Sequence, residues 1–362
     1  MHLPAEIIDL ITFYVEAGNS RSTSKKSTAR AFRIMNDKIR KDMAKLRLVN
    51  KSFCHSASAR LFRHIVAVAG SLSSTTRFPS LGRLVSLSNS PYAQYVHQVD
   101  VGYGTFPYSV AEVTLYTEDL AGLLSLCLRQ FPNLKALDFY GPPLASLPHD
   151  KMKASIDSIL MSLCYVPLPN LTELELQLPM TNDFATLFAE NISTLRIPIE
   201  HILKRLDYLG LHVYAQTNQQ SCAAHLLRII ELSTSLTSIS ISSTNYLGID
   251  CLKLSSTVHL RFLSLHKVKI SSRNLVNVVE QCKDSMEYIE LRHVKIESGA
   301  WKEILTSMES LPYLYDFDIS VGSSLTGNRE LHSTPTLSIA EDVPDQIALQ
   351  NLKQKAKLNR AV

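Results

Sequence analysis

A three-position apolar pattern recurs along most of the chain and constrains its fold more than any other feature. Each copy reads apolar-x-x-apolar-x-apolar, and successive copies begin between 24 and 38 residues apart. The last two apolar positions alternate with period two, which predicts a short half-buried strand in each copy. The eight copies are Val96-Val99-Val101, Leu134-Leu137-Phe139, Leu171-Leu174-Leu176, Leu206-Leu209-Leu211, Leu236-Ile239-Ile241, Leu260-Leu263-Leu265, Met286-Ile289-Leu291 and Leu314-Phe317-Ile319.

A second pattern, with the spacing i, i+3, i+4, i+7 of an amphipathic helix, precedes five of these strands. Its first residue always lies 11 to 15 residues before the strand that follows. Two periodicities that stay in phase indicate a solenoid of strand–helix units. The helical sets are Leu120-Leu123-Leu124-Cys127, Ile156-Ile159-Leu160-Leu163, Ala223-Leu226-Leu227-Ile230, Leu275-Val278-Val279-Cys282 and Trp301-Ile304-Leu305-Met308.

The strand pattern resembles the leucine-rich repeat family, whose motif is Leu-x-x-Leu-x-Leu in units of about 20–29 residues. The best matches run from Leu171 to Leu176 and from Leu260 to Leu265. The resemblance implies an α/β fold with a parallel sheet and helices on its convex side. The early units are longer than the family's, and the unit between Leu236 and Leu260 has no room for a helix. We therefore expect an irregular solenoid over about residues 90–321.

The first 66 residues predict a small helical module. Pro4 suits a first helical turn and Gly18 a stop, so residues 3–17 are expected to form a helix. Residues 46–53 and 57–65 are two further amphipathic stretches. Three short helices bury little apolar surface by themselves, which favours a partner surface on this module. The apolar face expected on the first helix comprises Ile7, Ile8, Ile11, Tyr14 and Val15.

Three motifs in this module resemble the F-box, particularly of the fungal type. They are Leu3-Pro4-x-Glu6-Ile7-x-x-x-Ile11, Leu46-x-Leu48-Val49-Asn50-Lys51-x-Phe53 and Ala59-x-Leu61-Phe62-Arg63. The segment from Phe78 to Asp100 is similar to the join between F-box and repeats in such proteins, so residues 67–89 are expected to be a connecting helical segment.

F-box proteins are substrate-recognition subunits of cullin-based (SCF-type) ubiquitin ligases. The resemblance implies that the module docks on a Skp-family adaptor bound to a cullin, while the repeats hold the target protein. A repeat scaffold with a degenerate F-box, working outside any ligase, is the alternative. The positions implied for adaptor contact are Leu3, Pro4, Ile7, Ile11, Leu48, Val49 and Phe53.

A basic insert separates the first two F-box motifs. Between Arg21 and Lys51 there are eleven Lys/Arg and two acids, so this stretch carries +9 and the rest of the chain −5. Residues 19–43 are expected to loop out, since lengthening a surface loop costs little entropy. Nucleic-acid binding or nuclear localisation is the alternative role, but Phe32 is the lone aromatic there, which makes nucleic acid a poor candidate partner.

The residues between the apolar strand positions predict the binding face of the repeats, since alternate strand residues point to opposite sides. Seven acids against one arginine make this concave face anionic, so the target protein is expected to offer a basic, extended segment. The basic insert is a competing occupant. The expected substrate-binding residues are Asp100, Asp138, Glu173, Glu175, Tyr208, His212, Phe262, His266, Tyr288, Glu290, Arg292, Asp316 and Asp318.

No motif for catalysis, phosphate binding or metal ligation stands out, so a non-enzymatic protein without cofactor or metal is expected. The six cysteines lack a Cys-x-x-Cys pair, and several occupy apolar positions, which is typical of core residues in a reducing compartment. No signal peptide or membrane span is evident, which favours the cytoplasm or nucleus. Residues 322–362 read as a polar tail with a short helix starting at Pro344.

Overall fold

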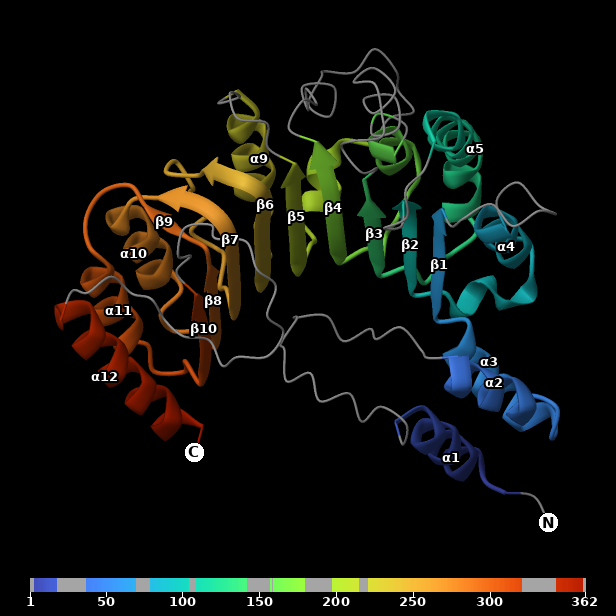
Figure 1. The fold of residues 1–362 in the computed structure, drawn as a ribbon. Coiled ribbons are helices and arrows are strands. Elements are labelled where there is room, and N and C mark those ends of the chain that lie inside the picture. The colour runs from blue at the N-terminus through green and yellow to red at the C-terminus, as the bar shows by residue number, and fades with distance from the viewer. Residues whose placement is uncertain are drawn as a thin grey trace. The chain divides into compact units, whose positions relative to one another are not determined.

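The computed structural model describes residues 3–17, 37–69, 79–103, 109–141, 157, 159–179, 197–214, 221–320 and 343–360. The chain divides into two compact units. Unit 1 comprises Met1–Leu171 with Leu195–Ile197, and unit 2 comprises Thr172–Thr194 with Pro198–Val362. Both units are α/β, with parallel strands and helices (Figure 1).

Unit 1 opens with three mutually packed helices, α1 (Ala5–Ala17), α2 (Asp37–Leu46) and α3 (Lys51–Leu61). Their shared core contains Ile39, Met43 and Ala57, flanked by partly buried apolar residues. The first helix lies where its pattern predicts it. The other two predicted helices, over residues 46–53 and 57–65, differ from the structure: residues 47–49 form a turn, and one helix, α3, ends at Leu61. Asn50 caps α3 by accepting a hydrogen bond from the Phe53 amide at 2.9 Å.

The expected insert over residues 19–43 overlaps α2. Residues 19–36 lie outside the described part of the chain, whereas Asp37 begins a helix whose Ile39 and Met43 are 4% and 0% exposed. The spacing of Ile39, Met43 and Leu46 places one apolar face against α3, with Lys38 and Lys41 exposed on the other side. The prediction that all of residues 19–43 loop out was therefore wrong for the last seven.

Unit 1 contains one parallel strand that precedes the first apolar triplet and was not predicted. The strand β1 (His64–Ala69) pairs in parallel with β2 (Gln98–Tyr103), which pairs with β3 (Ala136–Tyr140). The expected connecting segment thus contains part of a strand, followed by α4 (Pro79–Ser88) and the short 3-10 helix η1 (Pro91–Tyr95). The helix α5 (Val110–Leu128) begins with a capping box between Ser109 and Glu112, and residues 159–165 are also helical.

Unit 2 contains six parallel strands that pair in chain order: β4 (Glu173–Pro179), β5 (Tyr208–Tyr214), β6 (Ser238–Gly248), β7 (Phe262–Ile270), β8 (Tyr288–Arg292) and β10 (Asp316–Ser320). The short strand β9 (Lys295–Ile296) pairs with β7. The apolar triplet positions align across the strands, because Leu174, Leu209, Ile239, Leu263, Ile289 and Phe317 are successive register partners. Every triplet position in the chain is at most 3% exposed except Phe317, which is half-buried.

Helices cover the apolar face of these strands (Figure 1). They are α8 (Ile199–Leu203), α9 (Ser221–Leu232), α10 (Ser272–Gln281) and α11 (Trp301–Glu309). No helix separates β6 from β7, as the spacing predicted. The expected C-terminal helix is α12 (Val343–Asn359), which packs against α11, with Leu352 fully buried. This part of the expected polar tail therefore caps the last repeat.

Candidate functional site

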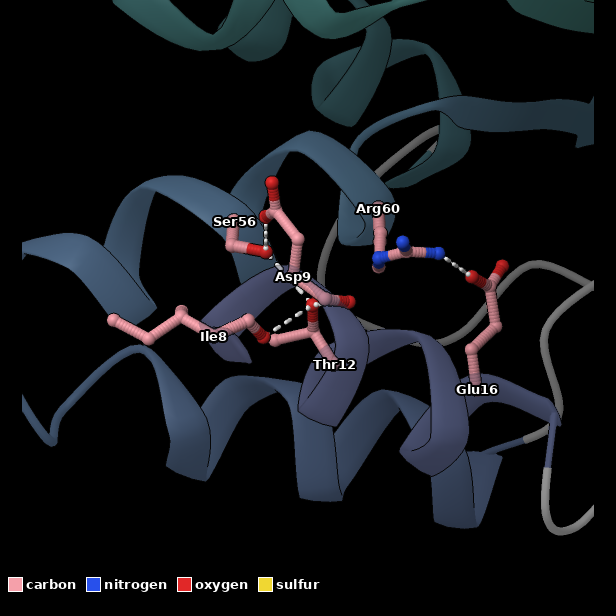
Figure 2. A network of polar contacts seen from close by, with 6 residues as sticks. All are labelled: Ile8, Asp9, Thr12, Glu16, Ser56 and Arg60. Atoms are coloured by element: carbon pink, nitrogen blue, oxygen red, sulfur yellow. Dashed lines mark hydrogen bonds and ion pairs between the residues drawn. The ribbon is translucent and has the colours of Figure 1, made fainter. Parts of the chain in front are cut away.

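The helix α1 meets α3 through polar side chains (Figure 2). Thr12 is 0% exposed, and its hydroxyl lies 2.7 Å from that of Ser56. Ser56 donates to a carboxylate oxygen of Asp9 at 2.5 Å, and Arg60 donates to Glu16 at 2.5 Å. Asp9, Thr12 and Glu16 recur at helical spacing, so they lie along one side of α1. That side contacts α3 and also contains the buried Ile8.

The opposite side of α1 is apolar and faces solvent. Leu3, Ile7, Leu10 and Tyr14 follow one another at intervals of four, three and four residues, and their exposed fractions run from 41% to 63%. We call these four residues the apolar stripe. A soluble helix ordinarily buries its apolar line and exposes its polar one. In α1 the inner side buries Ile8 and half-buries Ile11 and Val15, yet a second apolar line remains in solvent. An exposed apolar line of this kind is typical of a surface that another protein covers.

Two further apolar side chains protrude from the turn between α2 and α3. Leu48 is 86% exposed and Val49 is 61% exposed, although the turn itself is ordered by the Asn50 cap of α3. Arg47, just before them, stacks on the rings of Phe62 and Tyr92, with its guanidinium carbon 4.9 Å from each ring centroid. It also donates to the Tyr92 hydroxyl at 2.8 Å, which ties this turn to η1.

Most of the positions expected to contact an adaptor are on the surface of the helical module. Leu3, Pro4, Ile7, Leu48 and Val49 are exposed, and Ile11 is half-buried. Phe53 is different, since it is 8% exposed and belongs to the interior of the module. The prediction that it contacts an adaptor is therefore wrong.

Leu10, a prominent member of the stripe, was not predicted from the sequence. Its signal was present as an apolar residue seven positions after Leu3 and three after Ile7. The expected apolar face instead joined Ile7 and Tyr14 to Ile8, Ile11 and Val15, which the structure divides between the outside and the inside. Apolar residues surround most of this helix, so periodicity alone did not show which line is buried.

In unit 2 the residues between the triplet positions form three rows on the strand face that turns away from the helices. We call it the helix-free face. The first row runs Glu173, Tyr208, Ser238, Phe262, Tyr288 and Asp316. The second runs Glu175, Gly210, Ser240, Ser264, Glu290 and Asp318, and the third runs Gln177, His212, Ser242, His266, Arg292 and Ser320. The expected substrate-binding residues of this unit all lie in these rows.

Several acids of the helix-free face have cationic or hydroxyl partners. Arg292 lies 2.7 Å from both a Glu290 and an Asp318 carboxylate oxygen, and Arg360 at the end of α12 pairs with Asp316. The Tyr208 hydroxyl donates to Glu175 at 3.0 Å. The two side chains meet over Gly210, where a Cβ atom would contact both of them. The face is thus less anionic than the count of seven acids against one arginine predicted.

The third row carries two histidines with lowered pKa values. Burial is the main cause of the lowered pKa of His212, and Glu175 partly opposes it. Burial also lowers the pKa of His266, helped by the nearby His293, Lys267 and Arg292. Lys267 and His293 follow this row at equivalent places in β7 and after β8, and both have left-handed φ angles, of 53° and 52°.

Two expected face residues in unit 1 are buried instead. Asp100 and Asp138 are 2% and 1% exposed, and the Gln98 amide donates to both, at 2.9 and 3.2 Å. The Nε2 atom of His64 lies 2.9 Å from Asp100. A charge withdrawn from water needs such partners. These two aspartates therefore belong to an interior polar cluster rather than to an open binding face.

Two features are absent from the part of the chain that the structure describes. No cluster of three His, Cys, Asp or Glu side chains fit to hold a metal ion occurs there. None of the helices described is long and apolar enough to cross a bilayer. Cys127, Cys164 and Cys282 are buried, as their apolar positions predicted, whereas Cys251 is exposed.

Comparison with known proteins found matches among solved structures alone. No protein-family model matches the sequence, and neither does any curated protein. Among solved structures, the leucine-rich repeat-containing protein LegL7 from Legionella pneumophila aligns with 81% of this chain and 98% of its own, at 13% identity and a TM-score of 0.27. The register of its own strands makes this chain an α/β array of leucine-rich-repeat character, the architecture of a repeat-based binding scaffold.

Proposed function

We propose that the protein is the substrate-recognition subunit of a cullin-based ubiquitin ligase, in which α1 to α3 dock on a Skp-family adaptor and the repeats hold the target protein. The observation that carries the proposal is the exposure of the apolar stripe on α1, a second apolar line on a helix that already buries Ile8 on its inner side. Its polar residues Asp9, Thr12 and Glu16 meet α3, while the apolar stripe faces solvent. The F-box-like motifs supply the identity of the partner.

The stripe has the energetic capacity for such a contact. Burying an apolar side chain of this size is worth about 1.5–3 kcal/mol, so a few of them contribute much of an interface. Leu48 and Val49 extend the same chemistry onto the turn before α3. The network between α1 and α3 holds the stripe in place before binding, which reduces the entropy lost on association.

The target protein is proposed to bind on the helix-free face of unit 2. Phe262 is half-buried on this face, and its ring centroid lies 6.3 Å from that of Tyr288, which is buried at 6% exposed. The rows also carry Glu290 on β8, Asp316 and Asp318 on β10, and Glu173 and Glu175 on β4. Aromatic anchors with peripheral acids suit an extended segment that carries a few basic side chains. Such a subunit would work in the cytoplasm or nucleus, with ubiquitin transfer performed by other subunits.

The adaptor contact is tested by isothermal titration of the purified chain with a Skp-family adaptor. Replacing Ile7 and Leu10 with Asp is expected to abolish binding, because two charges would be buried at the centre of the interface. Ala44→Asp on α2 is the matched control, since Ala44 is also exposed but lies outside the stripe. Leu10 is preferred to Ile11 because Ile11 is half-buried, and its replacement would disturb folding.

A repeat scaffold outside any ligase is the second candidate. The observation that favours it is the separation of α1 from α2, since Ala17 ends one helix and Asp37 begins the next. An F-box ordinarily makes this passage within a few residues. Absence of heat on titrating the wild-type chain with adaptor at micromolar concentrations would reject the ligase role and leave this one.

A further inference from the structure

A cavity of about 480 Å³ lies in unit 1, where the helical module meets the first repeat. It is bordered by α2, the end of α3, β1, α4 and η1. Three consecutive residues of β1, from His64 to Val66, contribute to its wall. The strand β1 is the first strand of the sheet and pairs with β2. Its volume falls within the range of about 300–1,000 Å³ common for small-molecule sites.

The walls of this cavity are mostly apolar and aromatic. Leu61, Phe62, Ile65, Leu87 and Tyr92 line it. Phe62 and Tyr92 stack on each other with ring centroids 4.6 Å apart. Arg47 binds both rings from outside the cavity, so this part of the wall is fixed before any ligand arrives. A preformed apolar wall lowers the entropy cost of binding.

Two arginines give the cavity a positive charge. Arg40 of α2 and Arg83 of α4 line it, together with His64, and its lining includes no acid. Among the described residues no carboxylate is paired with either guanidinium. Guanidinium groups form strong paired hydrogen bonds with carboxylates and phosphates. The cavity therefore combines an apolar interior with two guanidinium donors for which the described part of the chain supplies no carboxylate partner.

We propose that this cavity binds a small amphiphilic anion: an apolar body, such as an alkyl chain, that ends in one carboxylate or phosphate group. The apolar body packs along Phe62, Ile65 and Leu87, and the anionic head is held by Arg40 and Arg83. The proposal does not rest on the adaptor function, because none of the stripe residues lines the cavity.

The test is a fluorescence titration of the full chain with 11-(dansylamino)undecanoic acid. Dodecanoate or dodecyl phosphate is expected to displace the probe, and the stronger competitor identifies the head group. Dodecanol, which has the same chain without charge, is expected to compete at least about tenfold less well, since a charge-assisted hydrogen bond contributes about that factor. The Arg40→Gln and Arg83→Gln variants are each expected to bind about tenfold more weakly.

Lys41→Gln is the matched control, because Lys41 is an exposed cation on α2 that does not line the cavity. Ser86→Trp fills the cavity and is expected to prevent binding. Arg83 is exposed, so its replacement leaves the fold intact, which thermal denaturation verifies. Equal competition by dodecanol and dodecanoate, unchanged affinity in both arginine variants, or no probe binding to the wild-type chain would each overturn the proposal.

Discussion

At the scale of single residues, Gly102 sets how closely β2 approaches β3. Its φ angle is +123°, and a Cβ atom built on it would lie 2.0 Å from the backbone oxygen of Tyr140. No side-chain rotation relieves a clash with backbone. We expect Gly102→Ala to lower the free energy of unfolding by about 2 kcal/mol or more, from left-handed strain and steric overlap together.

Chemical denaturation measures this loss, and Gly82→Ala provides the opposite case. Gly82 lies within α4, and nothing stands within 4 Å of an added Cβ. Alanine there is expected to stabilise the helix by about 0.5–1 kcal/mol. Equal effects of the two substitutions would contradict the close approach at Gly102.

His212 and His266 predict a pH dependence of stability. Both have pKa values lowered mainly by burial, from an ordinary value of 6.5. The unfolded chain therefore takes up protons near pH 6.5 that the folded chain refuses, so unfolding becomes easier as the pH falls below that value. We expect a lower melting temperature at pH 5.5 than at pH 7.5, and a smaller difference in a variant with Gln at both positions. A difference of the same size in the variant would assign the effect to other groups.

At the scale of elements, α12 closes the open end of the last repeat. Asn359 donates to the Leu314 carbonyl at 2.9 Å and Arg360 to the Tyr315 carbonyl at 2.7 Å, while Leu352 is fully buried. We expect Leu352→Ala to cost about 2–5 kcal/mol of unfolding free energy, the usual cost of such a core cavity. Arg360→Ala is expected to cost less than about 1 kcal/mol because the side chain is half exposed. A comparable loss in both would show that polar contacts, rather than burial, hold this helix.

The strands that carry the apolar triplets, and their register, were predictable from the sequence because one physical rule determines them. A parallel strand covered by helices buries alternate residues, and Leu174, Leu209 and Ile239 repeat that rule in register. The strand β1 escaped prediction because its inward residues include Ala67 and Ala69, which carry too little apolar signal. The helix α2 escaped because its many cations concealed two core residues.

The candidate sites were predictable only in part, because side-chain pairing is a property of three dimensions. Spacing along a strand placed Glu290 and Asp318 on one face, but nothing in it indicated that Arg292 bridges them. Asp100 lies between the triplet positions Val99 and Val101, where a strand residue is expected to be exposed, and its burial follows from its surroundings in unit 1. On α1 the apolar pattern indicated a surface, and the contact with Ser56 showed which side faces outward.

At the scale of the whole molecule, two surfaces of different chemistry are present on one chain. The apolar stripe lies on the helical module of unit 1, and the helix-free face, with its acids and aromatics, lies in unit 2. An apolar contact binds with little dependence on salt, whereas a charged face selects and steers its partner electrostatically. Under the proposed function, the apolar stripe would serve the constant adaptor and the helix-free face the selected target.

The charge on the helix-free face leads to the last prediction. The test uses a fluorescent, extended peptide rich in Lys and Arg, and it compares two double variants with the same change of net charge. Glu173→Lys with Glu175→Lys reverses two neighbouring acids on β4, and Glu231→Lys with Asp284→Lys reverses two exposed acids outside the rows. We expect the first variant to bind at least about tenfold more weakly than the second, because each close charge pair contributes on the order of 1 kcal/mol or more.

The affinity of the peptide for the wild-type chain should also fall as salt rises toward about 1 M, where the screening length shortens to about 3 Å. Equal losses in the two variants would mean that the peptide senses only total charge, and binding that ignores salt would remove the helix-free face as an electrostatic recognition surface.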